Sequence, residues 1–290
     1  MRFATCEYKG ATFPCVIKDN FAIKLSHFIN ISTMRDLLPF IEVANDEVLR
    51  KIESELKEIK MEVDNEIIFK LSDLKLRAPI LRPPAVFCLG FNYRAHAPEL
   101  KRSIPEEPIV FMKPSVSVIG PEDYIILPKA SKRVDYEVEL AIVIGRGGRY
   151  ISKERAYESI FGYTILNDIT ARDIQEKDFA LSRPWLRSKG FDTFAPIGPF
   201  IVTRDEIGYP IELELELRVN GNLRQKSNTR EMIFDVKTII EYISSFTTLE
   251  SGTIIATGTP EKVGQLNEGD VVEAYVEKIG VLRNKVIREK

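Results

Sequence analysis

Hydrophobic residues in the second part of the chain fall into short runs that are separated by glycine, proline and polar residues. From about residue 85 onward these runs include AVFCLGFNY, PIVFMK, SVSVIG, LAIVIG, FIVT, GTIIATG and DVVEAYVE. Runs of about four to eight apolar residues that end at turn residues are typical of buried β-strands. A succession of such strands predicts a β-rich body in which sheets pack face to face or close on themselves.

The first part of the chain has a different pattern. Residues 13–25, FPCVIKDNFAIKL, predict a β-hairpin that turns at Asp19. Apolar residues then recur at helical spacing from Val48 to Ile59, and Asp46 is the predicted N-cap of that helix. The pattern predicts a small α/β module, and the prolines between residues 79 and 84 mark a candidate junction with the β-rich body.

Two helices are predicted within the β-rich body. Ser152 is expected to cap a short helix that ends before Gly162. A longer helix is expected after Asn228, and its inner side is formed by Met232, Ile233, Val236, Ile239, Ile240 and Ile243.

Composition and charge exclude several classes of partner. The net charge is −2 and the charged residues are mixed, so the chain has no basic stripe of the kind that binds nucleic acid. It has no apolar stretch near the roughly 20 residues that span a bilayer, and no secretory signal is expected at its N-terminus. Three scattered cysteines do not form a disulfide framework, which predicts a cytoplasmic protein. Scarce Gln beside abundant Ile, Lys, Glu and Arg favours a thermophilic source.

Three acids stand at alternate positions at the start of a predicted core strand. Asp135, Glu137 and Glu139 alternate in VDYEVELAIVIG, and side chains at such positions share one face of a strand. A solvated strand edge is the usual explanation, and it fits IELELEL at residues 211–217, where Glu and Leu alternate. Here, however, the apolar run 140–144 follows directly, so the strand enters the core. Close carboxylates repel unless a cation neutralises them, so the pattern indicates a candidate cation site.

A third acid strengthens this interpretation. Asp168 lies near the end of GYTILND, which is otherwise an apolar strand. Glu137, Glu139 and Asp168 would offer three oxygen ligands from two strands, a set that suits Mg²⁺ or Mn²⁺. Zinc fits poorly, because the only histidines are His27 and His96 and the cysteines are not paired in spacing.

Four further residues are candidates for substrate chemistry. His96 and Glu99 follow Tyr93 in GFNYRAHAPE, and a spacing of three places them on one face of a helical turn. A carboxylate beside an imidazole orients it as a general base, although an exposed His–Glu pair has the same spacing. Lys189 is either a solvated loop residue or an electrostatic clamp. Thr259, in ATGTPEKVG, offers a hydroxyl and backbone amides to an anionic ligand.

These segments, taken in order, resemble the fumarylacetoacetate hydrolase family. The resemblance runs through LRAPILRPPAVFCLGFNYRAHAPE, PIVFMKPSVSVIGPED, VDYEVELAIVIGRGGR, GYTILNDITARDIQ, SKGFDTFAPIGPFIVT, VNGNLRQKSNTREMIFDV, SGTIIATGTPEKVG and EGDVVEAYVEKIGVLRNKV. It implies an α+β, β-rich fold, with a mixed β-sandwich roll as catalytic domain over residues 74–290. The small N-terminal α/β domain would cover residues 1–73.

The resemblance also implies roles for the candidate residues. It implies Mg²⁺ or Mn²⁺ on Glu137, Glu139 and Asp168, and a homodimer. It further implies catalytic His96 and Glu99 on a lid segment, a catalytic Lys189 that faces the substrate, and substrate-binding Tyr93 and Thr259. One departure is Lys262, because the usual run G-T-P-x-G-V-G reads GTPEKVG here.

Family substrates are 2-oxo acids or β-dicarbonyl compounds. The resemblance therefore implies a Mg- or Mn-dependent hydrolase that breaks a C–C bond of an acylpyruvate through a metal-stabilised enolate. Alternatives are a decarboxylase or isomerase of a 2-oxo dicarboxylic acid such as oxaloacetate, or of the homoprotocatechuate-pathway type, and a hydrolase or dehydratase of sugar-derived 2-keto-3-deoxy acids. A protein that binds metal and 2-oxo acid without turnover stays open. A glycosidase fits poorly, because acids two apart on one strand share a side instead of flanking a bond.

Overall fold

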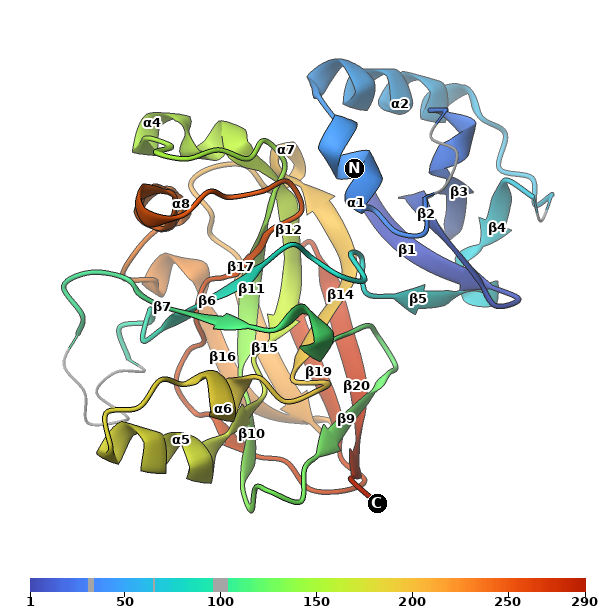
Figure 1. The fold of residues 1–290 in the computed structure, drawn as a ribbon. Helices are drawn as coiled ribbons and strands as arrows, with labels where there is room; N and C mark the ends of the chain where they lie inside the picture. The colour runs from blue at the N-terminus through green and yellow to red at the C-terminus, as the bar shows by residue number, and fades with distance from the viewer. Residues whose placement is uncertain (31–33, 65, 96–103) are drawn as a thin grey trace.

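The computed structural model describes residues 1–30, 34–64, 66–95 and 104–290. A long mixed sheet runs through it in the order β4-β3-β2-β1-β14-β12-β11-β17-β6-β7 (Figure 1). Its strands are β1 (Arg2–Tyr8), β2 (Ala11–Lys18), β3 (Phe21–Lys24), β4 (Ile68–Lys70), β6 (Val86–Gly90), β7 (Ile109–Lys113), β11 (Val138–Ile144), β12 (Ile160–Asn167), β14 (Ala195–Thr203) and β17 (Ile254–Ala256). Two short strands pair beside this path, β5 (Lys75–Arg77) with β1 and β8 (Val118–Ile119) with β14.

Two smaller sheets complete the β-structure. One has the order β16-β15-β19-β20-β9 and contains β9 (Tyr124–Leu127), β15 (Glu214–Val219), β16 (Asn222–Asn228), β19 (Val271–Val276) and β20 (Gly280–Arg288). The other joins β13 (Thr170–Ala171), β10 (Val134–Tyr136) and β18 (Gly264–Gln265). The helices are α1 (Leu38–Val43), α2 (Asp46–Glu58), α4 (Lys153–Ala156), α5 (Arg172–Ala180), α6 (Leu186–Lys189), α7 (Arg204–Ile207) and α8 (Val236–Phe246).

The main core lies between the central strands and the five-stranded sheet. Leu140 and Ile142 of β11 belong to the same buried cluster as Leu215 and Leu217 of β15. The glutamates of β15 alternate with these buried leucines and stay partly exposed, as the Glu–Leu alternation predicts. Strand β15 therefore gives one apolar face to the core, whereas β11 is buried on both faces, with Ala141 and Val143 in a second buried cluster. This arrangement confirms the predicted β-rich α+β fold.

The N-terminal strands continue the main sheet. The hairpin of β2 and β3 turns at Asp19, which has a φ of +52°, as predicted. Strand β1 pairs with β14 through Arg2 and Val202, and Phe3 shares a buried cluster with Phe161 of β12. The sheet and this core cross the expected boundary, so the division between residues 73 and 74 stays a prediction.

Two predicted helix starts are wrong. Asn45, not Asp46, caps α2, because its side-chain oxygen accepts hydrogen bonds from the backbone N–H groups of Glu47 and Val48. Helix α8 begins at Val236 with Asp235 as its N-cap. The segment after Asn228 forms only a 3₁₀ turn, Thr229–Glu231, so Met232 and Ile233 precede the helix.

The third predicted helix starts at the expected position, but the expected capping hydrogen bond is missing. Ser152 precedes α4, as predicted, although its side chain makes no capping hydrogen bond.

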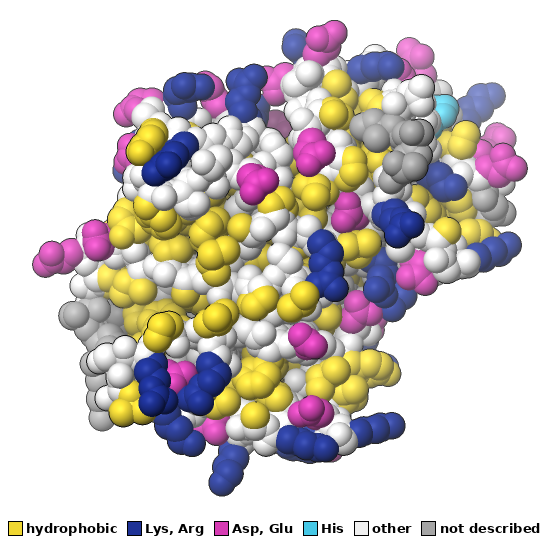
Figure 2. All heavy atoms as spheres, viewed as in Figure 1, with side chains coloured by type: hydrophobic (Ala, Val, Ile, Leu, Met, Phe, Trp, Pro, Cys, Tyr) yellow, Lys and Arg dark blue, Asp and Glu magenta, His cyan; other side chains and the backbone are white. Residues whose placement is uncertain are grey.

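Other expectations concern the surface and the cysteines. None of the helices in the described ranges is long and apolar enough to cross a membrane. The three cysteines are free and buried, and the Sγ atoms of Cys6 and Cys15 lie 3.0 Å apart on neighbouring strands. Figure 2 shows hydrophobic side chains across the middle of one face, where β7 runs, and Ile109 and Met112 of β7 are exposed. The homodimer stays a prediction.

Candidate metal centre

The acidic segment changes sheets at Glu137. Strand β10 ends at Tyr136 and belongs to the three-stranded sheet, whereas β11 begins at Val138 and belongs to the main sheet. Buried amide side chains replace the sheet hydrogen bonds at this break. The N–H of Glu137 donates to Asn167 Oδ1 at 2.9 Å, and the N–H of Val138 donates to Gln225 Oε1 at 3.1 Å. These bonds fix the direction in which the acids leave the strand.

The three predicted ligands lie together. Glu137, Glu139 and Asp168 are all buried, and one carboxylate oxygen from each lies within 4.8 Å of the others. The N–H of Asp168 donates to the carbonyl of Glu137 at 2.8 Å, which joins the two strands at this point. The structure thus brings together the acids that the period-two pattern and Asp168 predicted.

One carboxylate oxygen of this cluster is, among the described residues, free to bind a cation. Glu139 Oε2 accepts a hydrogen bond from the N–H of Gly258 at 2.7 Å, but Glu139 Oε1 is buried and has no partner among the described residues. Burial raises the pKa of Glu139, and the carboxylates of Asp168 and Glu137 raise it further. Buried polar atoms are nearly always paired, so an unpaired acceptor in an all-oxygen cluster fits a hard divalent cation.

Two buried lysines partly neutralise the acids. The Nζ of Lys189 donates to Glu137 Oε2 at 2.9 Å and to Asp168 Oδ2. The Nζ of Lys113 lies 2.5 Å from Asp168 Oδ1 and donates to the carbonyl of Ile169 at 3.0 Å. Burial disfavours the charge on Lys189, but Asp168 and Glu137 outweigh it and raise the pKa of this lysine.

An arginine binds the other side of the acidic segment. Arg172 donates from Nε to Asp135 Oδ2 at 2.9 Å, and its Nη atoms donate to Glu137 and Gln175. Arg133 forms a second ion pair with Asp135. Asp135 therefore forms ion pairs with two arginines and is not part of the ligand cluster, although it alternates with Glu137 in the sequence.

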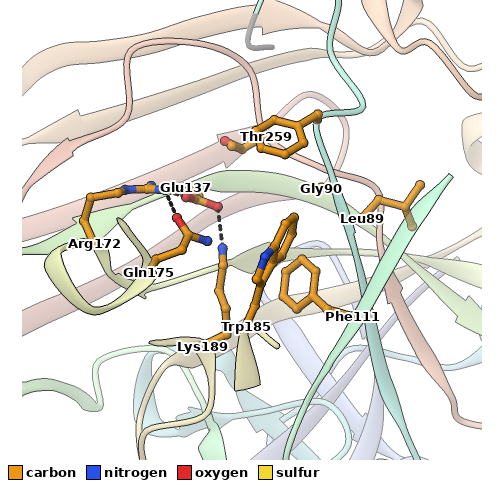
Figure 3. Close-up of a pocket in the computed structure, with 10 residues that line it drawn as sticks. Leu89, Gly90, Phe111, Glu137, Arg172, Gln175, Trp185, Lys189 and Thr259 are labelled. Carbon is orange, nitrogen blue, oxygen red and sulfur yellow. Dashed lines mark hydrogen bonds and ion pairs between the residues drawn. The ribbon is translucent and has the colours of Figure 1, made fainter. Parts of the chain in front are cut away.

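A pocket opens beside these groups (Figure 3). Its empty space is about 320 Å³ when the part open to solvent is included. Its lining residues are Leu89, Gly90, Phe91, Phe111, Glu137, Arg172, Gln175, Trp185, Lys189 and Thr259. Of the predicted site residues, Glu137, Lys189 and Thr259 line it. Thr259 Oγ1 accepts a hydrogen bond from Gln225 at 3.0 Å.

Tyr93 is not among the described residues of this lining. Tyr93 is buried in the core, and its hydroxyl has no partner among the described residues. Burial raises the pKa of this phenol. His96 and Glu99 lie outside the described residues. Lys262 adopts a φ of +67° in the turn after Thr259.

Sequence reasoning missed three polar groups of the site. Lys113 ends an apolar strand directly before a proline, in PIVFMKP, and a charge there is unusual enough to signal a buried partner. Arg172 and Gln175 lie three residues apart in ARDIQ, soon after Asp168. That spacing places both on one face at the start of α5, so proximity to Asp168 was an available signal.

Comparison with known proteins identifies the family. The family model of the C-terminal domain of fumarylacetoacetate (FAA) hydrolase matches residues 85–287. The chain belongs to this family.

Relatives in sequence include proteins of archaea and of animals. An uncharacterized protein of Methanocaldococcus jannaschii is 53% identical over 226 residues, which cover 78% of this chain and 92% of that protein. The mitochondrial oxaloacetate tautomerase Fahd2a of Rattus norvegicus is 43% identical over 223 residues, which cover 74% of this chain and 70% of the rat protein.

Solved structures of the family agree over whole chains. The fumarylacetoacetate hydrolase of Exiguobacterium antarcticum has a TM-score of 0.81 and 36% identity, with full coverage of both chains. The maleylpyruvate hydrolase of Sphingobium sp. SYK-6, in complex with manganese(II) ion and pyruvate, has a TM-score of 0.82 and 29% identity, also with full coverage of both. The fumarylacetoacetate hydrolase fold of this chain is therefore established.

Proposed function

We propose that this family member is a Mg²⁺- or Mn²⁺-dependent enzyme that hydrolyses a C–C bond in an acylpyruvate-type 2-oxo acid through an enolate. The observation that carries the proposal is the buried Glu139 Oε1, which lies within a three-carboxylate cluster and has no partner in the part of the chain that the structure describes. This cluster adjoins a pocket that Lys189 and Thr259 line. The donors are oxygens only, which favours Mg²⁺ or Mn²⁺ over softer metals.

Glu137, Glu139 and Asp168 would hold the cation. When bound, it would supply a Lewis acid that polarises the 2-oxo group and stabilises the negative charge of the enolate. These three side chains are positioned before binding, because Gly258 and the two lysines already hold them and Asn167 holds the backbone of Glu137.

Lys189 and Thr259 would bind the substrate from the pocket wall. Lys189 stays an ammonium group because Asp168 and Glu137 raise its pKa, so it presents a fixed positive charge where the enolate oxygen develops. The Thr259 oxygen already accepts a hydrogen bond from Gln225, which leaves its own proton to donate to a substrate carboxylate. Both groups act without reorganisation.

The water-activating step is assigned to His96, oriented by Glu99. For this step we rely on the resemblance of GFNYRAHAPE to the family pattern. His96→Gln should abolish acylpyruvate hydrolysis and leave Mn²⁺ affinity unchanged, because the imidazole would remove a proton from water and not ligate the metal. Full retained hydrolysis would remove the pair from the mechanism.

A second candidate is isomerisation or decarboxylation of a 2-oxo dicarboxylic acid. It is favoured by relatives named oxaloacetate tautomerase and by a similar solved structure named 5-carboxymethyl-2-hydroxymuconate delta-isomerase. The same enolate-stabilising groups serve these reactions, and no attack by water is needed.

A substrate panel separates the candidates. Acylpyruvates, oxaloacetate and sugar-derived 2-oxo acids would each be assayed with Mg²⁺, with Mn²⁺ and with EDTA. Release of pyruvate from acylpyruvates supports hydrolysis, whereas enol–keto exchange or CO₂ loss from oxaloacetate alone supports the second candidate. Turnover that persists in EDTA would refute the metal-dependent proposal. Oxalate binding without turnover of any substrate would make the chain a binding protein.

A further inference from the structure

The pocket has two chemically different halves (Figure 3). Its polar half contains Glu137, Arg172, Gln175, Lys189 and Thr259. Its apolar half contains Leu89, Phe91, Phe111 and Trp185, packed around Gly90. We call the rings of Phe91, Phe111 and Trp185 the aromatic wall. The polar half would bind the 2-oxo acid end of a substrate, but this leaves the aromatic wall without an assigned role.

Trp185 is held in place from several sides. Its ring centroid lies 5.8 Å from that of Phe91 at an angle of 86°, and 5.1 Å from that of Phe111. Phe179 packs on it from α5 at 5.1 Å but does not line the pocket. A Cβ on Gly90 would lie 2.6 Å from the Trp185 ring, so only glycine allows the ring this position. The wall is therefore a rigid surface built by packing.

The cations of the pocket are already paired. Arg172 forms ion pairs with Asp135 and Glu137, and Lys189 forms ion pairs with Glu137 and Asp168. They are the two cationic side chains among the described lining residues. A second carboxylate at the far end of a substrate would thus meet aromatic rings and, among the described lining residues, no uncommitted positive charge. These residues would not compensate the cost of desolvating that carboxylate.

We infer that the aromatic wall is the subsite for an uncharged, apolar acyl group. The preferred substrates are then acylpyruvates with a hydrocarbon or aryl acyl group, and 2-oxo dicarboxylic acids such as oxaloacetate are disfavoured. This inference rests on the proposed function, because it assumes that the 2-oxo acid end faces the acidic cluster. Trp185 is its principal specificity-determining residue.

The first test measures binding, so it does not depend on turnover. Benzoylformate and oxomalonate share a 2-oxo acid head and differ only in carrying a phenyl ring or a second carboxylate. Calorimetry on the Mn²⁺-loaded protein should give benzoylformate at least about tenfold tighter binding, as expected when an apolar group fills a matched site. Because Trp185 is the sole tryptophan of the chain, its fluorescence should also change on binding the phenyl compound.

Two leucine variants locate the effect. Trp185→Leu should remove most of the preference for benzoylformate, because it shortens the wall itself. Phe246→Leu is the matched control, since it removes a ring of α8 that packs on Tyr242 and not on the wall. It should keep the preference. Equal losses in both variants, or tighter binding of oxomalonate by the unmodified protein, would overturn the inference.

Turnover then separates this inference from the proposed function. With Mn²⁺, kcat/KM should rise at least about tenfold from acetylpyruvate to benzoylpyruvate, and oxaloacetate should be the poorer substrate. Hydrolysis of acylpyruvates with no rise toward benzoylpyruvate overturns the subsite and keeps the proposed function. If no 2-oxo acid is turned over but benzoylformate still binds tighter, the proposed reaction fails and the subsite stands.

Discussion

Lys113 offers the sharpest test of the charge balance in the metal centre. Its ammonium group has no exposed surface, contacts Asp168 Oδ1 at 2.5 Å and donates to the carbonyl of Ile169. Lys113→Met keeps a long, unbranched side chain and removes the charge. In metal-free protein, this leaves one oxygen of the buried Asp168 without its cation.

The expected magnitude follows from the contacts that remain. Breaking a buried ion pair by removing one partner costs about 3–5 kcal/mol. Lys189 still donates to Asp168 Oδ2 in the variant, so we expect the lower end, about 3 kcal/mol. At about 2–4 °C for each kcal/mol, the unfolding midpoint should fall by about 6–12 °C.

The assay is thermal and urea unfolding in EDTA, followed by circular dichroism. Lys226→Met is the matched control, because Lys226 also pairs with two carboxylates, Glu214 and Glu216, but is half-exposed. It should leave the midpoint unchanged, since exposed pairs are screened by solvent. A Lys113 variant as stable as the Lys226 variant would refute the idea that Asp168 carries a buried charge which Lys113 balances.

Three further outcomes are expected. Glu139→Gln should weaken Mn²⁺ binding at least about tenfold in calorimetry, because it replaces the carboxylate whose oxygen lacks a partner; unchanged affinity would mean that the cation binds elsewhere. Because the pKa of Glu139 is raised above 4.5, the folded metal-free protein holds a proton that the unfolded chain releases. Its unfolding free energy should therefore fall as pH rises from 4.5 through the raised value, and a flat urea-unfolding profile would contradict this. Burial raises the pKa of Cys15, so a thiol reagent should label it only after unfolding, and rapid labelling of native protein would count against this burial.

The acidic cluster was predictable because its signal is local. A period of two places Glu137 and Glu139 on one side of a strand, and Asp168 ends a second apolar strand. Asp135 shows the limit of this reasoning. Alternation alone groups it with the other two acids, but the strand changes sheets at Glu137 and Asp135 meets Arg172 instead. Such a change of sheet depends on hydrogen bonds that the backbone donates to Asn167 and Gln225, which lie far away in the sequence.

The aromatic wall and Lys113 depend on tertiary contacts. Phe111 and Trp185 are more than 70 positions apart, and only the packing of β7 against the segment before α6 brings their rings together. A single sequence gives no signal for such a meeting. The predicted start of α2 is wrong by one residue. Asn45 and Asp46 are adjacent, and both residue types are good N-caps, so propensity does not choose between them.

The division of the pocket has a consequence for how this scaffold diversifies. The three clustered acids are encoded between residues 137 and 168, whereas the rings of the wall come from residues 91, 111 and 185. Under the proposed function, exchanging rings of the wall would change the accepted acyl group while the clustered acids stay encoded elsewhere. Phe111 is the ring that touches the polar half, because Lys189 Nζ lies 5.0 Å from its centroid. Mutant libraries that vary residues 91, 111 and 185 would reproduce such a change of substrate in the laboratory.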